Sequence, residues 1–230
     1  MAYTAPRSLG TVANTLACPK DAFCDLDQRP SWLSALLVFA SVSILLNIVL
    51  WPYADKATLM VLPPGVDPAR VDEVLKQFAA LRVVALLLTP LFVWLRISII
   101  AGLLFIFLAL ITGTADFRKL LSVTAHAQLV LLFNSAITTS VVVVLGIDRI
   151  ESPTDLTAGA NLDLLVHADN AMLRSICQMI GPFDLWYIIL LILGVATVGH
   201  CSKAKALVCV IGYWMVSAGF NVAMAGLAGS

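Results

Sequence analysis

Five apolar runs, each long enough to cross a lipid bilayer as a helix, constrain the fold of this chain more than any other feature. They cover approximately residues 31–53, 81–112, 120–146, 183–199 and 204–227. Because an α-helix rises about 1.5 Å per residue, about 20 apolar residues cross the roughly 30 Å hydrocarbon layer. Only 12% of the residues are charged, against about 25% in soluble domains. The sequence therefore predicts an all-α integral membrane protein with five transmembrane helices and short interfacial amphipathic helices.

The first two spans have recognisable ends. Trp32 and Trp51 lie near the two ends of the first span, where aromatic rings favour the headgroup region. A turn at Leu62-Pro63-Pro64-Gly65 follows. The second run contains Pro90 and Arg96, and we expect one tilted span with a kink at the proline. Two short half-spans that meet near Arg96 are the alternative.

Two amphipathic segments lie outside the predicted spans. Residues 1–30 form a cytoplasmic N-terminal segment, and residues 31–230 form the five-helix membrane domain. Within the first segment, Cys18 to Pro30 predicts an interfacial helix, and we expect the residues before it to be flexible. A second helical pattern from Leu162 to Met179 predicts an amphipathic helix on the opposite surface. The apolar face of the first of these helices consists of Ala22, Phe23 and Leu26.

Charges in the loops indicate an orientation. The short loops around Arg118-Lys119 and Lys203–Lys205 are basic, and with five spans both lie on the side of the N-terminus. The long segment from Asp148 to Asp184 is acid-rich. Positive charge in short loops marks the cytoplasmic face. We therefore expect the N-terminus inside and the C-terminus outside.

Several motifs resemble the Yip family, membrane proteins named for interaction with Ypt/Rab small GTPases. Gly181-Pro-Phe-Asp-Leu-Trp186, which leads into an apolar run with Gly194 in mid-span, is similar to the family's entry into its fourth helix. Ser202-Lys-Ala-Lys-Ala206 and Trp214 resemble its last turn and helix, and Phe117-Arg-Lys-Leu-Leu-Ser-Val-Thr-Ala-His126 resembles its entry into the third helix. Gly181 stands where members often carry an acidic residue. The long N-terminal region and the Asp-Leu-Tyr-Gly-Pro motif of eukaryotic members are absent, so the resemblance is to bacterial-type members.

This resemblance implies a non-enzymatic, membrane-organising or partner-binding protein in a bacterial cytoplasmic (inner) membrane. Its implied partners are the lipid bilayer and another membrane protein or a second copy of the chain. The formal net charge is zero and the basic residues are scattered, so we expect no nucleic-acid partner. No cofactor is implied.

Polar residues inside the apolar runs suggest a second hypothesis for the function. An arginine near the middle of a membrane helix costs about 2.5–3.5 kcal/mol, so Arg96 should face the bundle, a water-filled cavity or a carboxylate. Asn221 could supply an acceptor, and His126 and Asn134, about two helical turns apart, share a face. These four residues either fix helix packing or form an intramembrane polar site. In the second case the alternative function is a small permease or permease subunit.

Small residues in the last span could let another helix approach closely. Gly219 and Ala223 form a small-xxx-small pair, the pattern of close helix contacts in membranes. The candidate packing face consists of Gly212, Gly219, Ala223 and Gly226. This face could pack within the bundle or against a second copy of the chain, and the sequence is consistent with both.

The sequence lacks the motifs of common enzyme classes and metal sites. It contains no Gly-x-Ser-x-Gly, no His-Glu-x-x-His and no Gly-x-x-x-x-Gly-Lys, the arrangements that position nucleophiles, zinc and phosphates. Cys18 and Cys24 are a poor half of a zinc site. We therefore predict neither an enzyme nor a metal site.

Overall fold

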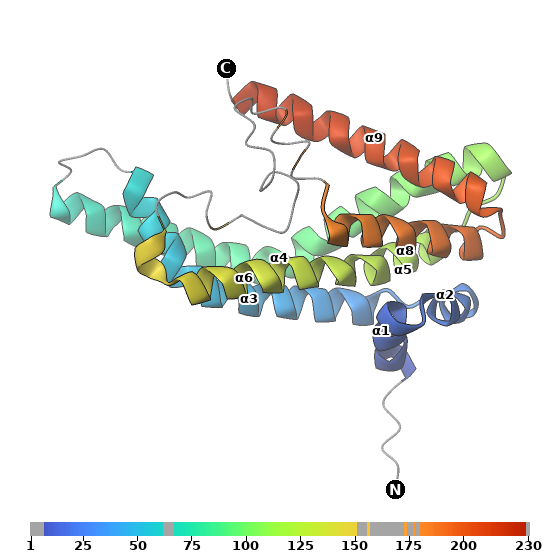
Figure 1. The fold of residues 1–230 in the computed structure, drawn as a ribbon, viewed down its shortest axis with the longest axis horizontal. Coiled ribbons are helices and arrows are strands. Elements are labelled where there is room, and N and C mark those ends of the chain that lie inside the picture. Colours follow the sequence, from blue (N-terminus) through green and yellow to red (C-terminus); the bar gives the residue numbers. More distant parts are fainter. Residues whose placement is uncertain are drawn as a thin grey trace, which may run out of the picture.

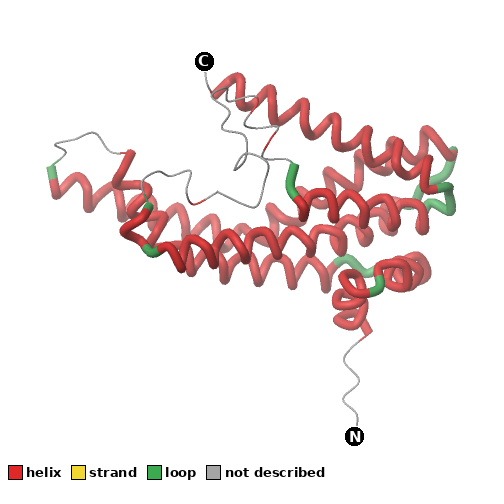
Figure 2. Tube along the Cα trace, in the orientation of Figure 1, coloured by secondary structure: helices red, strands yellow, loops and turns green. Residues whose placement is uncertain are grey.

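A computed structural model describes residues 7–61, 67–150 and 180–228, together with the single positions 156, 173 and 177. Regular structure in these residues is entirely helical, as Figure 2 shows. Four helical stretches are long and apolar enough to cross a membrane, and a fifth apolar helix is shorter. The prediction of an all-α integral membrane protein is confirmed. The helices of the apolar ranges are α3 (Leu33–Val61), α4 (Pro68–Thr112), α5 (Phe117–Ala127), α6 (Leu131–Leu145), α8 (Pro182–Val198) and α9 (Lys203–Ala228).

The longest helices, α3 and α4, lie antiparallel along the length of the molecule (Figure 1). α4 contains 45 residues without interruption, with Pro90 inside it. It rises about 67 Å, whereas a bilayer with its headgroups measures about 40–45 Å. Because the helix is unbroken at Arg96, two half-spans that meet there are not present, and α4 begins at Pro68, before the predicted start at residue 81.

α3 continues past the predicted end of the first span at residue 53. Pro52 lies inside the helix, where it removes one backbone donor. Contacts with α4 hold the following turns, because the Arg82 guanidinium pairs with Asp55 and donates to the Thr58 hydroxyl at 3.1 Å. Lys56 donates to the carbonyl of Ile147 at 2.5 Å. These polar contacts lie at the end of the bundle remote from the α4–α5 loop.

The range predicted as the third span, residues 120–146, is interrupted by a 3-10 turn. α5 is followed by Gln128–Val130 in 3-10 conformation and then by α6. Asp116 caps α5, since its carboxylate accepts from the backbone N–H groups of Arg118 and Lys119 at 2.9 and 3.2 Å. From Leu120 to Ala127 every residue of α5 is buried, because α3, α4, α8 and the N-terminal helix α2 (Pro19–Gln28) surround it.

α8 and α9 begin and end within one residue of the ranges expected from the sequence. α8 is a short helix of 17 residues, and it packs mainly against α2, α5 and α9. α9, with 26 residues, lies against both α4 and α8. The later part of α9 therefore continues beyond the start of α8.

The N-terminal segment is more ordered than expected. Residues Arg7–Ala17 form α1, and Pro19–Gln28 form α2, so the expectation of a flexible chain before residue 18 is wrong for residues 7–17. Phe23 and Leu26 are fully buried, and α2 lies mainly against α8 and also contacts α5. The predicted apolar face of α2 thus covers protein, and the Thr11 hydroxyl of α1 donates to Asp25 at 2.8 Å. The amphipathic helix expected over residues 162–179 falls outside the described residues, apart from two single positions.

Candidate functional site

A groove between α4 and α9 contains the most unusual polar groups of the apolar region. Its volume is about 700 Å³. The groove is largely apolar, and its polar side chains are Arg96 from α4 and Tyr213, Ser217 and Asn221 from α9. All residues that line it belong to α4 or α9, which lie against each other.

Arg96 is the charged group of this groove. It lies about 24 Å along the helix axis from Thr112 and about 21 Å from Arg82, near the centre of an uncharged stretch of α4. Its side chain is exposed, and it makes no ion pair within the described residues. The Asp184 carboxylate at the start of α8 interacts with it electrostatically at longer range. Arg96 is therefore an exposed cation without a direct counter-ion among the described residues.

The polar residues of α9 form a short stripe. Tyr213, Ser217 and Asn221 follow one another at intervals of four residues, so they share one face of the helix. The Asn221 amide donates to the backbone carbonyl of Ser217 at 2.8 Å, and its side-chain oxygen can act as an acceptor.

Four buried side-chain atoms among the described residues make no hydrogen bond of normal geometry. They are the Tyr187 hydroxyl, both polar atoms of the Gln128 side chain and Nε2 of His126. Tyr187 lies beside Tyr213 and Gln128 and within electrostatic range of Arg96, yet no hydrogen bond of normal geometry joins them. Each such atom costs about 1–3 kcal/mol, so this polar group is not explained by packing alone.

The structure brings together two of the four polar residues singled out from the sequence. Arg96 and Asn221 line the same groove. His126 is fully buried on α5, where its Nδ1 lies 2.9 Å from the Ser122 carbonyl. Asn134 is half-buried on α6, beyond the 3-10 turn, so neither residue lines the groove.

The small residues of α9 do not act as one packing face. Gly212 lies against α4, where an added methyl group would meet the Phe107 ring at 3.0 Å. Gly219 has no atom within 4 Å of such a methyl group, and Ala223 is exposed. Gly226 lies in the last turns of α9. The exposed pair therefore faces away from the bundle.

Sequence reasoning missed Tyr213 and Ser217 of the groove, and the buried residues Gln128 and Tyr187. The first two could have been found, because they precede Asn221 at exact helical spacing on one face. Gln128 and Tyr187 come from different helices, and only the packing of α5 against α8 relates them.

The groove can recognise a negatively charged group that is carried by an apolar molecule. Arginine binds carboxylates and phosphates through parallel N–H donors, and apolar side chains surround Arg96. Among the described residues no group of three His, Cys, Asp or Glu side chains could hold a metal ion. The arrangement suits binding, and it offers no paired nucleophile and base.

Comparison with known proteins agrees with this description. A family model of the Yip1 domain matches residues 13–224. No curated protein and no solved structure matches the chain. Proteins of this family are typically non-enzymatic and act in membrane trafficking, which agrees with the prediction that the chain is not an enzyme. Because the match extends from α1 almost to the end of α9, the chain belongs to the Yip1 domain family.

Proposed function

We propose that the protein organises membrane proteins by binding a partner in the groove between α4 and α9. The partner is a transmembrane helix of another protein that carries an aspartate or glutamate within its apolar stretch. One observation carries this proposal: the Arg96 guanidinium is exposed in an apolar groove without an ion pair among the described residues.

Charge complementarity selects this occupant over a second copy of the chain. In the five apolar ranges of the sequence, Asp184 is the sole carboxylate, and it already interacts with Arg96 of its own chain. A second copy would therefore bring no further carboxylate to the groove. A partner carboxylate would gain a charge-assisted hydrogen bond in a region without water, and Asn221 could bind a polar group beside it.

We also propose in which membrane the protein lies and how it is oriented there. We place the protein in a bacterial cytoplasmic membrane, with the N-terminus inside and the C-terminus outside. Supporting this orientation, α2, the loop before Arg118 and the loop before Lys203 lie at one end of the bundle (Figure 1). Basic residues of short loops collect on the cytoplasmic side.

The test is purification of the tagged full chain from native membranes in mild detergent, with Arg96→Gln and Arg96→Lys beside the wild type. We expect one stoichiometric membrane protein with the wild type and its loss with Arg96→Gln. Arg96→Lys keeps the charge but not the bidentate geometry, so it should retain part of the partner. Thermal unfolding of each variant alone shows whether the fold persists. A partner that stays with a folded Arg96→Gln variant contradicts the proposal.

A small permease is the second candidate, and a different observation favours it. Tyr213, Tyr187 and Gln128 continue the polar groups from the groove into the core, and some of their atoms make no hydrogen bond. Proton or chloride flux into proteoliposomes that disappears with folded Arg96→Gln would support this function. A flux that is equal in the wild type and in lipid-only vesicles would reject it.

A further inference from the structure

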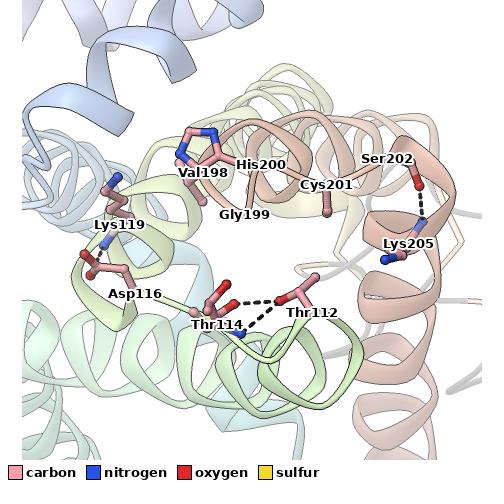
Figure 3. Close-up of a pocket in the computed structure, with 11 residues that line it drawn as sticks. Thr112, Thr114, Asp116, Lys119, Val198, Gly199, His200, Cys201, Ser202 and Lys205 are labelled. Carbon is pink, nitrogen blue, oxygen red and sulfur yellow. Dashed lines mark hydrogen bonds between the residues drawn. The ribbon is translucent and has the colours of Figure 1, made fainter.

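A second cavity lies at the end of the bundle where the α4–α5 loop meets the α8–α9 loop. Its volume is about 580 Å³. Figure 3 shows Lys119 and Lys205 on opposite sides of it, with Thr114 on one edge and His200 on the other. The apolar parts of α4 and α8 end here at Thr112 and Val198, so the cavity lies at the level where phospholipid headgroups begin.

The basic side chains of this cavity differ in how they are held. Lys119 donates to Asp27 of α2 at 2.6 Å, and Nε2 of His200 lies 3.4 Å from the other oxygen of the same carboxylate. Lys205 is exposed and makes no ion pair in the described part of the chain. One cation is therefore fixed in place, and another is free to bind a ligand.

Two carboxylates, Asp27 and Asp116, balance the formal charge of the two lysines, but both carboxylates already have partners of their own, whereas Lys205 has no ion pair in the described part of the chain. Asp27 is shared between Lys119 and His200, and Asp116 accepts from two backbone N–H groups at the start of α5. Neither belongs to a group of three metal-binding side chains, since none was found among the described residues. An anion suits this cavity better than a cation.

Two backbone features of the α8–α9 loop also favour an anion in the cavity. His200 has a positive φ of 45°, a conformation that costs about 1–2 kcal/mol in a residue other than glycine. The N-terminus of α9 opens beside the cavity, where the N–H of Lys205 reaches the Ser202 hydroxyl at 3.4 Å. Free N–H groups at a helix start favour anions. In this cavity they add to the attraction of the lysine side chains.

We propose that this cavity binds a phosphate group, with Lys119 and Lys205 as its charged contacts and His200 as a further donor. The phosphate belongs either to an anionic phospholipid headgroup or to a free phosphate ion. Basic pockets between membrane helices at the headgroup level are suited to anionic lipids. The site is separate from the groove of α4 and α9, and it does not depend on the proposed function.

The test uses the full chain in mild detergent and native mass spectrometry. The probes are phosphatidylglycerol, phosphatidylcholine with the same acyl chains, and inorganic phosphate. We expect one tightly held phosphatidylglycerol and weaker retention of phosphatidylcholine. Lys205→Gln should lower the bound phosphatidylglycerol about fivefold, the effect of one lysine at a membrane surface.

Matched variants make this result specific to the cavity. Lys203→Gln removes the same charge from an exposed lysine at the same end of α9 that does not line the cavity, and it should change retention less than about twofold. His200→Gly removes a cavity side chain where glycine suits the positive φ, and an unchanged melting temperature of this variant shows that a loss of lipid does not come from misfolding.

The outcomes also identify the source of the phosphate. Phosphatidylglycerol that remains bound in excess inorganic phosphate supports the site as a lipid site. Inorganic phosphate that displaces the lipid and raises the melting temperature supports it as a site for the free ion. Equal retention of the two lipids without a phosphate effect, or equal losses with Lys203→Gln and Lys205→Gln, overturns the proposal.

Discussion

Gly194 lies on α8 at a point where the helix has no room for a side chain. A methyl group at this position would overlap the Val123 side chain of α5 and approach the Phe23 ring of α2 to 3.2 Å. Small residues at such points let membrane helices approach closely. Gly219 on α9 offers the opposite case, because nothing lies within 4 Å of an added methyl group.

These two glycines give a matched prediction at the residue scale. Gly194→Ala should lower the stability by about 1–3 kcal/mol, since α5 and α8 must move apart. Gly219→Ala should leave it unchanged or raise it by up to about 1 kcal/mol, since alanine favours the helix. Thermal unfolding in one detergent measures both. Equal melting temperatures for Gly194→Ala and the wild type would show that the described packing is wrong.

Single residues also show what a sequence can predict about a site. Arg96 and Asn221 could be selected because charged and amide groups are rare in apolar runs. Their position in one groove could not be predicted, because it depends on how α9 packs against α4. Gln128 is a further example, since its burial follows from the packing around the 3-10 turn.

At the scale of helices, α2 is the element whose role changed most between sequence and structure. Its apolar face suggests a surface helix on lipid, but Phe23 is 0% exposed and lies in the main core. Asp27 of the same helix reaches Lys119 of α5. The N-terminal helices are therefore part of the packed bundle.

This docking predicts a large effect of one side chain in α2. Phe23→Ala should cost about 3–5 kcal/mol, because it leaves a cavity among α2, α5 and α8. Cys24→Ala, at the next and exposed position, is the control and should have little effect. Thermal unfolding and limited proteolysis of residues 7–28 report the result. If residues 7–28 of Phe23→Ala resist proteolysis as well as those of the wild type, α2 is not docked through Phe23.

Helix boundaries could be predicted where local signals mark them. α8 starts after Gly181 with Pro182 in its first turn, which suits a helix start, and the sequence located it within one residue. α1 has no strong local signal, and its contacts are with α2, α3 and α5. The extension of α3 past Pro52 likewise depends on Arg82 of α4, far away in the sequence.

The whole molecule has two different ends. The N-terminal helices and the basic loops lie at one end (Figure 1), and the Arg82–Asp55 pair lies towards the other. This distribution supports the proposed orientation, with the loop cavity on the cytoplasmic side.

The orientation predicts where thiols can be labelled. In the proposed orientation, a membrane-impermeant maleimide added to intact cells should not react with Cys18 or Cys24, which are exposed in the structure. Both should react once the membrane is permeabilised. Burial raises the pKa of the Cys201 thiol, so it should react more slowly at neutral pH because the thiolate is the nucleophile. A variant with alanine at Cys177, Cys201 and Cys209 isolates the two N-terminal thiols, and their labelling in intact cells would reverse the proposed orientation.

The proposed function requires that the groove between α4 and α9 holds a transmembrane helix of another protein. A photo-crosslinking amino acid at Val216 in the groove, and at Met215 on the outward face as control, tests it in native membranes; the two side chains are 47% and 60% exposed. We expect Val216, and not Met215, to crosslink to one membrane protein through a segment that contains Asp or Glu. The Arg96→Gln exchange should abolish this crosslink. A crosslink from Val216 to lipid alone, to residues 157–172 of the same chain, or to a second copy would contradict it.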